Sequence, residues 1–323
     1  MERVSGVNNW KLVIRREAAG VVILWAATCD ARAALPDTLF GLPVTALGHH
    51  ALTPGSRTAE GTSVRFTCGP ETGELDNRQL RELTLPDTLT AMGDYALFRC
   101  AALEHLTMGD RVESWGGCVF MNCRALNRFT LHLADDRAVT LCRILDELTR
   151  ELEVTLRYPD GGEARLVFPE YQESYEENGP AHHFDYNIFG AGYPYHHSFR
   201  NRTFDIGAYD RLWPAYLGTE HDPDCALRMA WWRLRTPRGL KPEAAAAYLA
   251  HLRGRAGEVL DWLLARRDME GLHWFLDAGA PDRETLSGAC ETARRRELPE
   301  AQALLLESLH RRFPADRRRR FEL

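Results

Sequence analysis

One stretch of the chain repeats itself at a fixed offset. Residues 83–87, Leu-Thr-Leu-Pro-Asp, return 23 positions later as residues 106–110, Leu-Thr-Met-Gly-Asp. The positions that share this offset are Leu80/Leu103/Leu126, Leu83/Leu106/Phe129, Leu85/Met108/Leu131, Leu89/Val112, Gly93/Gly116, Phe98/Met121 and Cys100/Cys123. Apolar residues in an L-x-x-L-x-L spacing at a period in the low twenties are typical of a solenoid, in which each coil stacks on the next. A solenoid presents an extended surface and no deep catalytic cleft, so the repeat favours an interaction protein over an enzyme.

The alternation within each repeat predicts a buried face and an outward face. Leu83 and Leu106 are expected to point inward from short strands, and the residues on either side of them to point outward. The side chains predicted on this outward row, which we interpret as a partner-binding face, are Glu82, Thr84, His105, Thr107, Arg128 and Thr130. Gly93 and Gly116 are expected to allow a tight backbone bend before a short helical turn. Cys100 and Cys123 recur at the period, as small buried apolar residues do.

An altered repeat precedes the clear ones. Residues 35–39, Leu-Pro-Asp-Thr-Leu, are identical in sequence to residues 85–89. About residues 53–79 are rich in Pro, Gly, Ser, Thr and Glu, which predicts a surface insertion. Residues 21–29 are apolar and follow two arginines, a composition that export signals and buried strands share. Because Gly20 interrupts the approach and Thr28 suits a lipidated cysteine poorly, we interpret this segment as the first strand of the repeat domain.

These residues resemble a known family. The run Met92-Gly93-Asp94-Tyr95-Ala96-Leu97-Phe98-Arg99-Cys100, after Leu85-Pro86, is similar to the BspA-type bacterial leucine-rich repeats, and the likeness extends over about residues 20–135. It implies a leucine-rich-repeat solenoid of short parallel strands and short helical turns in residues 1–150. It also implies surface adhesion as an alternative role, because relatives of this family are exported. The sequence departs from the family pattern at residues 115–118, Trp-Gly-Gly-Cys, and in its long insertion.

Residues 151–215 form a second region. Residues 154–158 and 164–168 alternate around Asp160-Gly161-Gly162, which predicts a β-hairpin. Residues 169–215 are rich in aromatic residues and histidine without a sustained period, and we expect an irregular, ordered connector. Its histidines are candidate metal ligands, so a metal-binding, small-ligand-binding or hydrolytic site here is the alternative to an interaction module. The four candidates are His182, His183, His196 and His197.

From residue 216 to residue 323 the sequence predicts an all-α domain of helical hairpins. The apolar spacing indicates helices at 223–235, 242–253, 256–266, 269–278, 283–296 and 299–312. Pro242 and Pro299 suit the first turn of a helix, and Gly279 suits a C-terminal cap. Two segments of this region, about 30 residues apart, have similar sequences and resemble ankyrin-like helix pairs. The Thr-Pro-Leu-His signature of ankyrin repeats is missing. The predicted fold class is therefore α+β, a leucine-rich-repeat solenoid followed by helices.

Composition narrows the function. The formal net charge of −6 argues against a general nucleic-acid binder, and the chain has no apolar run long enough to span a membrane. Searches for a nucleophile elbow, a phosphate-binding loop and a dinucleotide fingerprint find none, so no catalytic residue and no cofactor are predicted. Eight cysteines in 323 residues are too sparse for a disulfide framework and favour thiols in a reducing cytoplasm. We predict a non-enzymatic, cytoplasmic protein-interaction scaffold, and the sequence leaves its partner and oligomeric state open.

Overall fold

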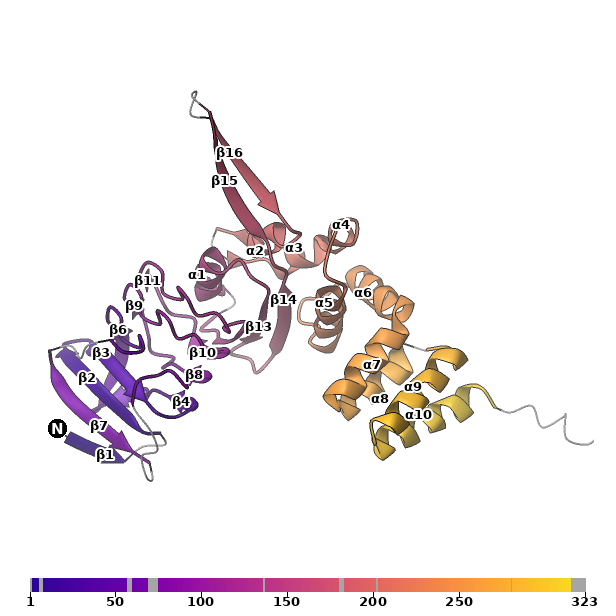
Figure 1. The fold of residues 1–323 in the computed structure, drawn as a ribbon, viewed down its shortest axis with the longest axis horizontal. Helices are drawn as coiled ribbons and strands as arrows, with labels where there is room; N and C mark the ends of the chain where they lie inside the picture. Colours follow the sequence, from indigo (N-terminus) through magenta and orange to yellow (C-terminus); the bar gives the residue numbers. More distant parts are fainter. Residues whose placement is uncertain are drawn as a thin grey trace, which may run out of the picture. The chain divides into compact units, whose positions relative to one another are not determined.

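The computed structural model describes residues 2–5, 8–56, 60–68, 75–135, 137–179, 183–201, 203–279 and 281–314, with the backbone alone at residues 2–5, 178, 183 and 184. The chain divides into two compact units. The solenoid unit holds Met1–Asp222 with Thr236–Gly239, and the helical unit holds Pro223–Arg235 with Leu240–Leu323. Figure 1 shows strands, coils and a few short helices in the first unit and helices alone in the second. The structure therefore confirms the predicted order, a solenoid followed by a helical region.

A six-stranded sheet forms one side of the solenoid. Its strands lie in the order β14-β13-β12-β10-β8-β4, parallel except for β14. Their bounds are β4 Arg32–Ala34, β8 Glu82–Thr84, β10 His105–Gly109, β12 Arg128–His132, β13 Leu152–Arg157 and β14 Glu163–Phe168. Leu106 is paired with Leu83 on one side and Phe129 on the other, and all three side chains are buried. The 23-residue repeat thus places its leucines in consecutive rungs of one apolar spine, as predicted.

The second sheet joins the coils to an antiparallel N-terminal part. Its order is β1-β7-β2-β3-β6-β9-β11, with β5 beside β6. The bounds are β1 Glu2–Ser5, β2 Trp10–Glu17, β3 Gly20–Thr28, β5 Thr38–Leu39, β6 Leu42–Leu47, β7 Thr62–Thr67, β9 Ala91–Met92 and β11 Ser114–Trp115. β3 pairs antiparallel with β2 and parallel with β6, so it links the two parts.

Two N-terminal predictions need correction. The apolar segment 21–29 does form a strand, but β1 and β2 precede it and β2 is its antiparallel partner, so it is not the first strand. The predicted insertion at residues 53–79 contains β7, which pairs with β2 and buries Val64 and Phe66. The turn-forming residues around β7 dominate the composition of this segment and hide the short alternating strand within it.

The repeated glycines allow the coils to approach each other closely. A Cβ atom on Gly93 would lie 2.6 Å from the carbonyl carbon of Gly48, and one on Gly116 would lie 2.4 Å from the backbone nitrogen of Asp94. Neither glycine is among the described residues with positive φ, so the predicted tight bend is not the reason for glycine here. The reason is contact between the backbones of successive coils.

Two carboxylates join helix α1, Val139–Glu147, to the preceding coil. Asp110 accepts hydrogen bonds from the backbone nitrogens of Val139 (2.9 Å) and Thr140 (2.5 Å), which caps the helix from the preceding coil. At the other end of α1, Glu147 accepts from the backbone nitrogen of Phe120 (2.6 Å) and the indole nitrogen of Trp115 (3.2 Å). Burial raises the pKa of both carboxyl groups, and these hydrogen bonds partly oppose that shift.

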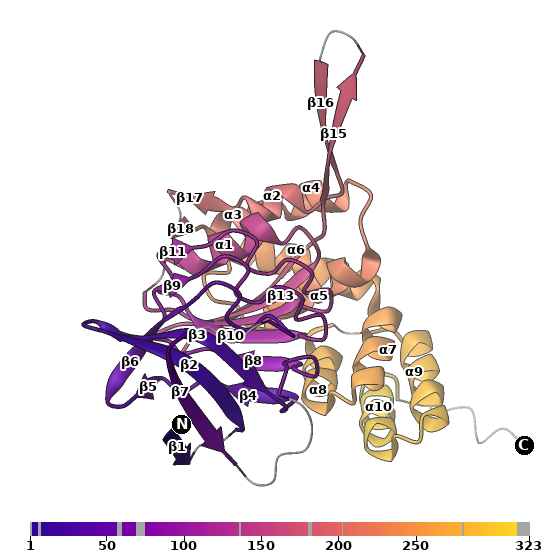
Figure 2. The same ribbon diagram turned by 60° about the vertical axis from the view of Figure 1, so that its left-hand side comes forward.

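The connector has more regular structure than its sequence predicts. It contains the hairpin β15 Gln172–Asn178 and β16 His183–Phe189, short strands β17 Phe199–Arg200 and β18 Thr203–Phe204, and helices α2 Tyr193–His196, α3 Ile206–Arg211 and α4 Trp213–Leu217. Aromatic rings hold it together, since Phe168 contacts the rings of His196, Phe204 and Tyr209 at centroid distances of 5.7–6.0 Å. Figure 2 shows the hairpin standing away from these helices and from the coils. The strands escaped prediction because charged and aromatic residues alternate irregularly along them.

The helical unit closely follows its predicted pattern. Its helices are α5 Pro223–Arg235, α6 Pro242–Gly254, α7 Ala256–Arg266, α8 Met269–Ala278, α9 Arg283–Arg295 and α10 Pro299–Arg312. Pro242 and Pro299 lie in first turns as predicted, and Gly279 caps α8 in a right-handed conformation. The Trp231 ring contacts Trp262 and Trp274 edge-on in the core. The likeness to ankyrin-like helix pairs stays a prediction. No described helix combines the length and the apolar character that crossing a bilayer requires.

Candidate interaction surface

The six-stranded sheet places the predicted partner-binding residues side by side. Glu82, His105 and Arg128 are direct neighbours across β8, β10 and β12, and so are Thr84, Thr107 and Thr130. The repeat period produces this alignment because each coil returns the same position to the same place in the ladder. The two rows therefore lie next to each other on the outer side of the sheet, opposite the buried spine.

The rows continue beyond the predicted residues. Arg32 and Ala34 of β4 extend them at one end, and Glu153 and Thr155 of β13 extend them at the other. Sequence reasoning missed these four residues for two reasons. The long segment between β4 and β8 breaks the 23-residue period, so β4 was not seen as a strand equivalent to β8. Residues 154–168 were interpreted as a separate hairpin. An offset of 25 residues between Phe129 and its rung partner Val154 is the signal that could have found β13.

Charged side chains of the first row form ion pairs with neighbouring side chains, some of them outside the row. Arg32 and Glu82 lie 3.2 Å apart, and Glu104 lies 2.7 Å from Arg81 and 3.4 Å from Arg128. Arg165 and Glu153 form a further pair at the β13–β14 end, where both side chains are largely buried. Exposed pairs of this kind contribute about 0–1 kcal/mol each to stability. They orient the side chains and leave the face with mixed charge.

His105 is half-buried at the centre of the face. Its Nε2 atom lies 3.0 Å from the hydroxyl oxygen of Thr130. Burial lowers the pKa of His105, and the neighbouring Arg128 lowers it further, so the imidazole is neutral at pH 7. Thr130 itself is 6% exposed, so it is a buried residue and not the exposed contact that alternation predicts. The accessible part of the second row is formed by Thr84 and Thr107.

The comparison with known families concerns the same coils. Residues 75–139 match the sequence model described as the BspA type leucine rich repeat region, in six copies. The coils over residues 75–139 are BspA-type leucine-rich repeats. The face described above lies mainly on these repeats, with additions from β4, β13 and β14. No curated protein sequence matches the chain.

Two solved structures are similar to part of the chain. One is a leucine rich cell surface protein from Faecalibacterium prausnitzii A2-165, with 19% identity and a TM-score of 0.25, covering 37% of this chain and 30% of its own. The other is the leucine rich repeat protein of T. pallidum, with 14% identity and a TM-score of 0.22, covering 37% of this chain and 68% of its own. The chain thus spans under a third of the first structure's length.

The four candidate metal ligands fall in different surroundings. His182 lies outside the described residues, and only the backbone of His183 is described, in β16. His196 is buried and lies in the connector, outside the BspA-type repeats. Its Nε2 atom is 2.9 Å from the carbonyl oxygen of Pro169, and its Nδ1 atom is 3.4 Å from that of Leu145. His197 is exposed and stacks on Tyr193. Among the described residues, no three His, Cys, Asp or Glu side chains are grouped to hold a metal ion.

The repeated cysteines are buried thiols. Cys100 lies 3.4 Å from the carbonyl oxygen of Leu52, and Cys123 lies 3.0 Å from that of Leu97. Burial raises the pKa of Cys123 to about 12 and that of Cys100 well above its usual value. Since the thiolate is the nucleophile, these positions suit packing and not reaction.

Proposed function

We propose that the protein is a non-enzymatic interaction scaffold that binds a protein partner on the outer face of its six-stranded sheet. The observation that carries this proposal is the alignment of Glu82, His105 and Arg128 beside Thr84 and Thr107 in two adjacent rows. The match of residues 75–139 to BspA-type repeats supports a scaffold in general terms, because solenoids expose extended binding surfaces.

The polar chemistry of the face favours a protein partner. The charges on Glu82 and Arg128 are already paired with neighbours, so a partner would not have to desolvate isolated ions. Neutral His105 and the threonine hydroxyl groups both donate and accept hydrogen bonds. Such a surface can match the mixed donors and acceptors of a folded protein, whereas a polyanion would need a concentration of unpaired cations.

Proximity labelling in the native cell tests the proposal. Thr84→Arg adds a bulky charge on the face, and His105→Ala removes its central ring. Thr90→Arg is the matched control, because Thr90 is also exposed but lies outside the strands of the face. We expect one set of labelled proteins to fall about tenfold, roughly 1.4 kcal/mol in affinity, with both face variants and not with the control. Unchanged labelling by folded face variants would refute the proposal.

The cysteines support a cytoplasmic setting as part of the same proposal. Cys68 and Cys118 are exposed thiols. Exposed thiols persist most readily where glutathione and thioredoxin keep them reduced. Fractionation of native cells tests this assignment, and recovery of the protein in the surface fraction would favour adhesion.

A further inference from the structure

The β15–β16 hairpin is an unsupported element with an apolar surface. Four of the seven large apolar side chains that are exposed in the described part of the chain lie on it, namely Tyr175, Tyr186, Ile188 and Phe189. Tyr175 is 71% exposed and pairs with Tyr186 across the hairpin, at a ring-centroid distance of 4.8 Å. An isolated two-stranded hairpin is marginally stable in water, and exposed aromatic clusters mark contact sites.

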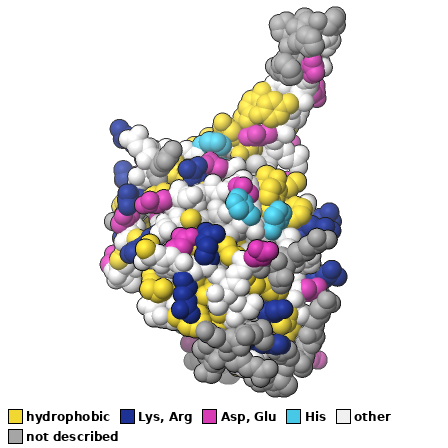
Figure 3. All heavy atoms as spheres, turned by 90° about the vertical axis from the view of Figure 1, so that its left-hand side faces the viewer, with side chains coloured by type: hydrophobic (Ala, Val, Ile, Leu, Met, Phe, Trp, Pro, Cys, Tyr) yellow, Lys and Arg dark blue, Asp and Glu magenta, His cyan; other side chains and the backbone are white. Residues whose placement is uncertain are grey.

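The hairpin is also acidic. The strands β15 and β16 contain four carboxylates and no lysine or arginine. Glu173 and Glu177 share the face of the Tyr175–Tyr186 pair, because residues two apart on a strand point to the same side. Figure 3 shows hydrophobic side chains along the projecting element with acidic side chains beside them. The partner of this element therefore needs both cations and apolar contacts.

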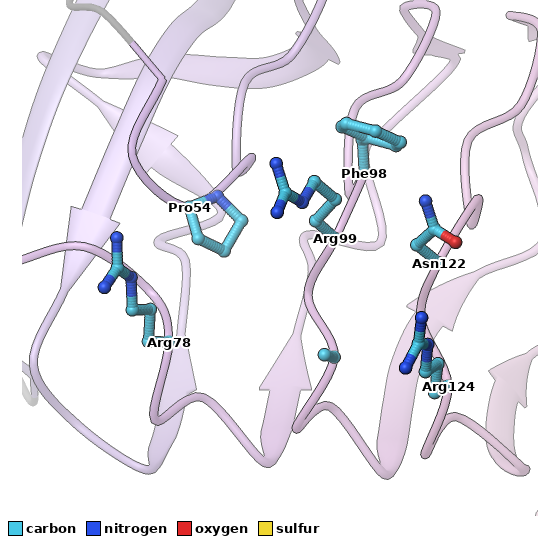
Figure 4. Close-up of a pocket in the computed structure, with 7 residues that line it drawn as sticks. Pro54, Arg78, Phe98, Arg99, Asn122 and Arg124 are labelled. Atoms are coloured by element: carbon cyan, nitrogen blue, oxygen red, sulfur yellow. The ribbon is translucent and has the colours of Figure 1, made fainter.

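A groove of that chemistry lies on the turns of the solenoid. A hollow of about 730 Å³ is lined by Arg78, Arg99 and Arg124 together with Pro54, Phe98, Ala101 and Asn122. Figure 4 shows the three arginines around this hollow, on neighbouring coils. Arg78, Ala101 and Arg124 are equivalent positions at the 23-residue period, so a small residue between two arginines leaves the space open.

Two of the three arginines of the groove, Arg99 and Arg124, are available for an anion. Arg78 is 2.8 Å from Asp76, but within the described ranges neither Arg99 nor Arg124 forms an ion pair. Arg150 does not line the groove, but its guanidinium donates to the carbonyl oxygens of Cys123 and Arg124 and so adds a positive charge beside Arg124. In a chain with a net charge of −6, this concentration of cations is a distinct local feature.

Arg99 lies in a left-handed turn that recurs at the same position of the next coil. Arg99 has φ +61°, and Asn122 has φ +64° at the equivalent position of the next coil. Asparagine adopts this left-handed conformation several times more readily than arginine does. Asparagine at position 99 is therefore expected to keep the backbone conformation of this turn.

We propose that the β15–β16 hairpin of one molecule docks into the arginine groove of a second copy. Glu173 and Glu177 would pair with the guanidinium groups, and Tyr175 would stack on one of them, as arginine and aromatic rings do. The contact joins molecules and does not form within one, because Figures 1 and 2 both show the hairpin extending away from the coils of its own unit. Hairpin and groove are different surfaces, so the assembly is head-to-tail and can continue.

Sedimentation velocity of the full chain across protein concentration tests the proposal. We expect association with a dissociation constant of about 1–100 µM that weakens several-fold when salt rises toward 0.5 M. Arg99→Asn should abolish it while keeping the backbone conformation, and so should Glu173→Lys on the hairpin. Arg111→Gln is the control, because Arg111 is an exposed arginine of the coils outside the groove. A parent protein that stays monomeric over this range would overturn the proposal.

Mixing the two variants distinguishes head-to-tail docking from pairing between like surfaces. Arg99→Asn retains an intact hairpin, and Glu173→Lys retains an intact groove, so each alone should be monomeric. Their mixture should form a dimer of one copy each and stop there, because each molecule has one working surface. If Arg99→Asn still self-associates, or if the mixture stays monomeric, the hairpin does not dock into the groove. The sheet face takes no part in this contact, so either outcome leaves the proposed function standing.

Discussion

The BspA-type coils and the connector bury their side chains in different ways. In the coils, Leu106 meets Leu83 and Phe129, its own equivalents in the adjacent coils. In the connector, the polar atoms of two buried aromatic side chains, Tyr209 and His196, lie within hydrogen-bond distance of backbone carbonyl oxygens. Tyr209 donates from its hydroxyl group to the Val167 carbonyl oxygen at 2.7 Å, and His196 lies 2.9 Å from that of Pro169.

The difference shows how each region is stabilised. In the coils the stability comes mainly from apolar burial that repeats at every rung, and no titratable group lies in the spine of Leu83, Leu106 and Phe129. In the connector the stability depends on individual hydrogen bonds and on a buried imidazole that stays neutral. We therefore expect the coils to respond to changes of volume and the connector to changes of polarity and pH.

Truncation of a central rung should have the largest effect. Leu106 is completely buried between two neighbouring rungs, so Leu106→Ala creates a cavity and should destabilise the protein by about 2–5 kcal/mol. Thr107→Ala, on the outward side of the same strand, is the control and should change stability by less than about 0.5 kcal/mol. Urea unfolding measures both. A loss below about 1 kcal/mol for Leu106→Ala would mean that the coils do not depend on their shared spine.

Acidification should affect the connector through His196. Burial lowers the pKa of this imidazole to about 4, below the value near 6.5 of an unfolded histidine. The stabilisation is complete above pH 6.5 and is lost as pH falls toward 4, by about 3 kcal/mol in total. His196→Gln should remove this part of the pH dependence, as measured by urea unfolding at several pH values. His197→Gln, an exposed neighbour, should keep the parent profile, and an equal slope in all three proteins would exclude His196 as its source.

Removal of one hydroxyl group should have the smallest effect of the three. Tyr209→Phe deletes the buried hydrogen bond to Val167 and leaves the carbonyl group unpaired, which should cost about 1–2 kcal/mol. The ring contacts with Phe168 and Tyr195 remain. Phe204→Leu is the complementary change, because it alters ring packing and keeps the hydrogen bond. If Tyr209→Phe proves neutral in urea unfolding, apolar packing alone holds the connector.

Much of the fold follows from local pattern, and the exceptions have physical causes. The predicted helices 256–266 and 269–278 coincide with α7 and α8, because the apolar spacing of both helices and the N-cap Asp268 of α8 act within a few residues. β7 was missed, since its burial depends on β2 some fifty residues earlier. Thr130 was predicted as exposed but is buried. Side chains of other segments cover it, and the alternating pattern within its own strand carries no information about them.

Of the two candidate surfaces, the sequence predicted the sheet face but not the arginine groove. The period alone predicted that His105 lies between Glu82 and Arg128, because a repeat fixes which residues become neighbours in a parallel ladder. The arginine groove escaped prediction, since Arg99 and Arg124 belong to different positions of the repeat and meet only where the turns of adjacent coils pack.

The sequence by itself determined the stacking of residues 80–131 and the helical character of the chain after residue 222, because periodic burial is encoded within each segment. The tertiary structure alone decided that β13 and β14 extend the same sheet, that β7 closes the N-terminal part, and that an acidic hairpin stands apart from the coils. Those arrangements depend on contacts between residues distant in the chain, and such contacts leave no periodic pattern in either partner.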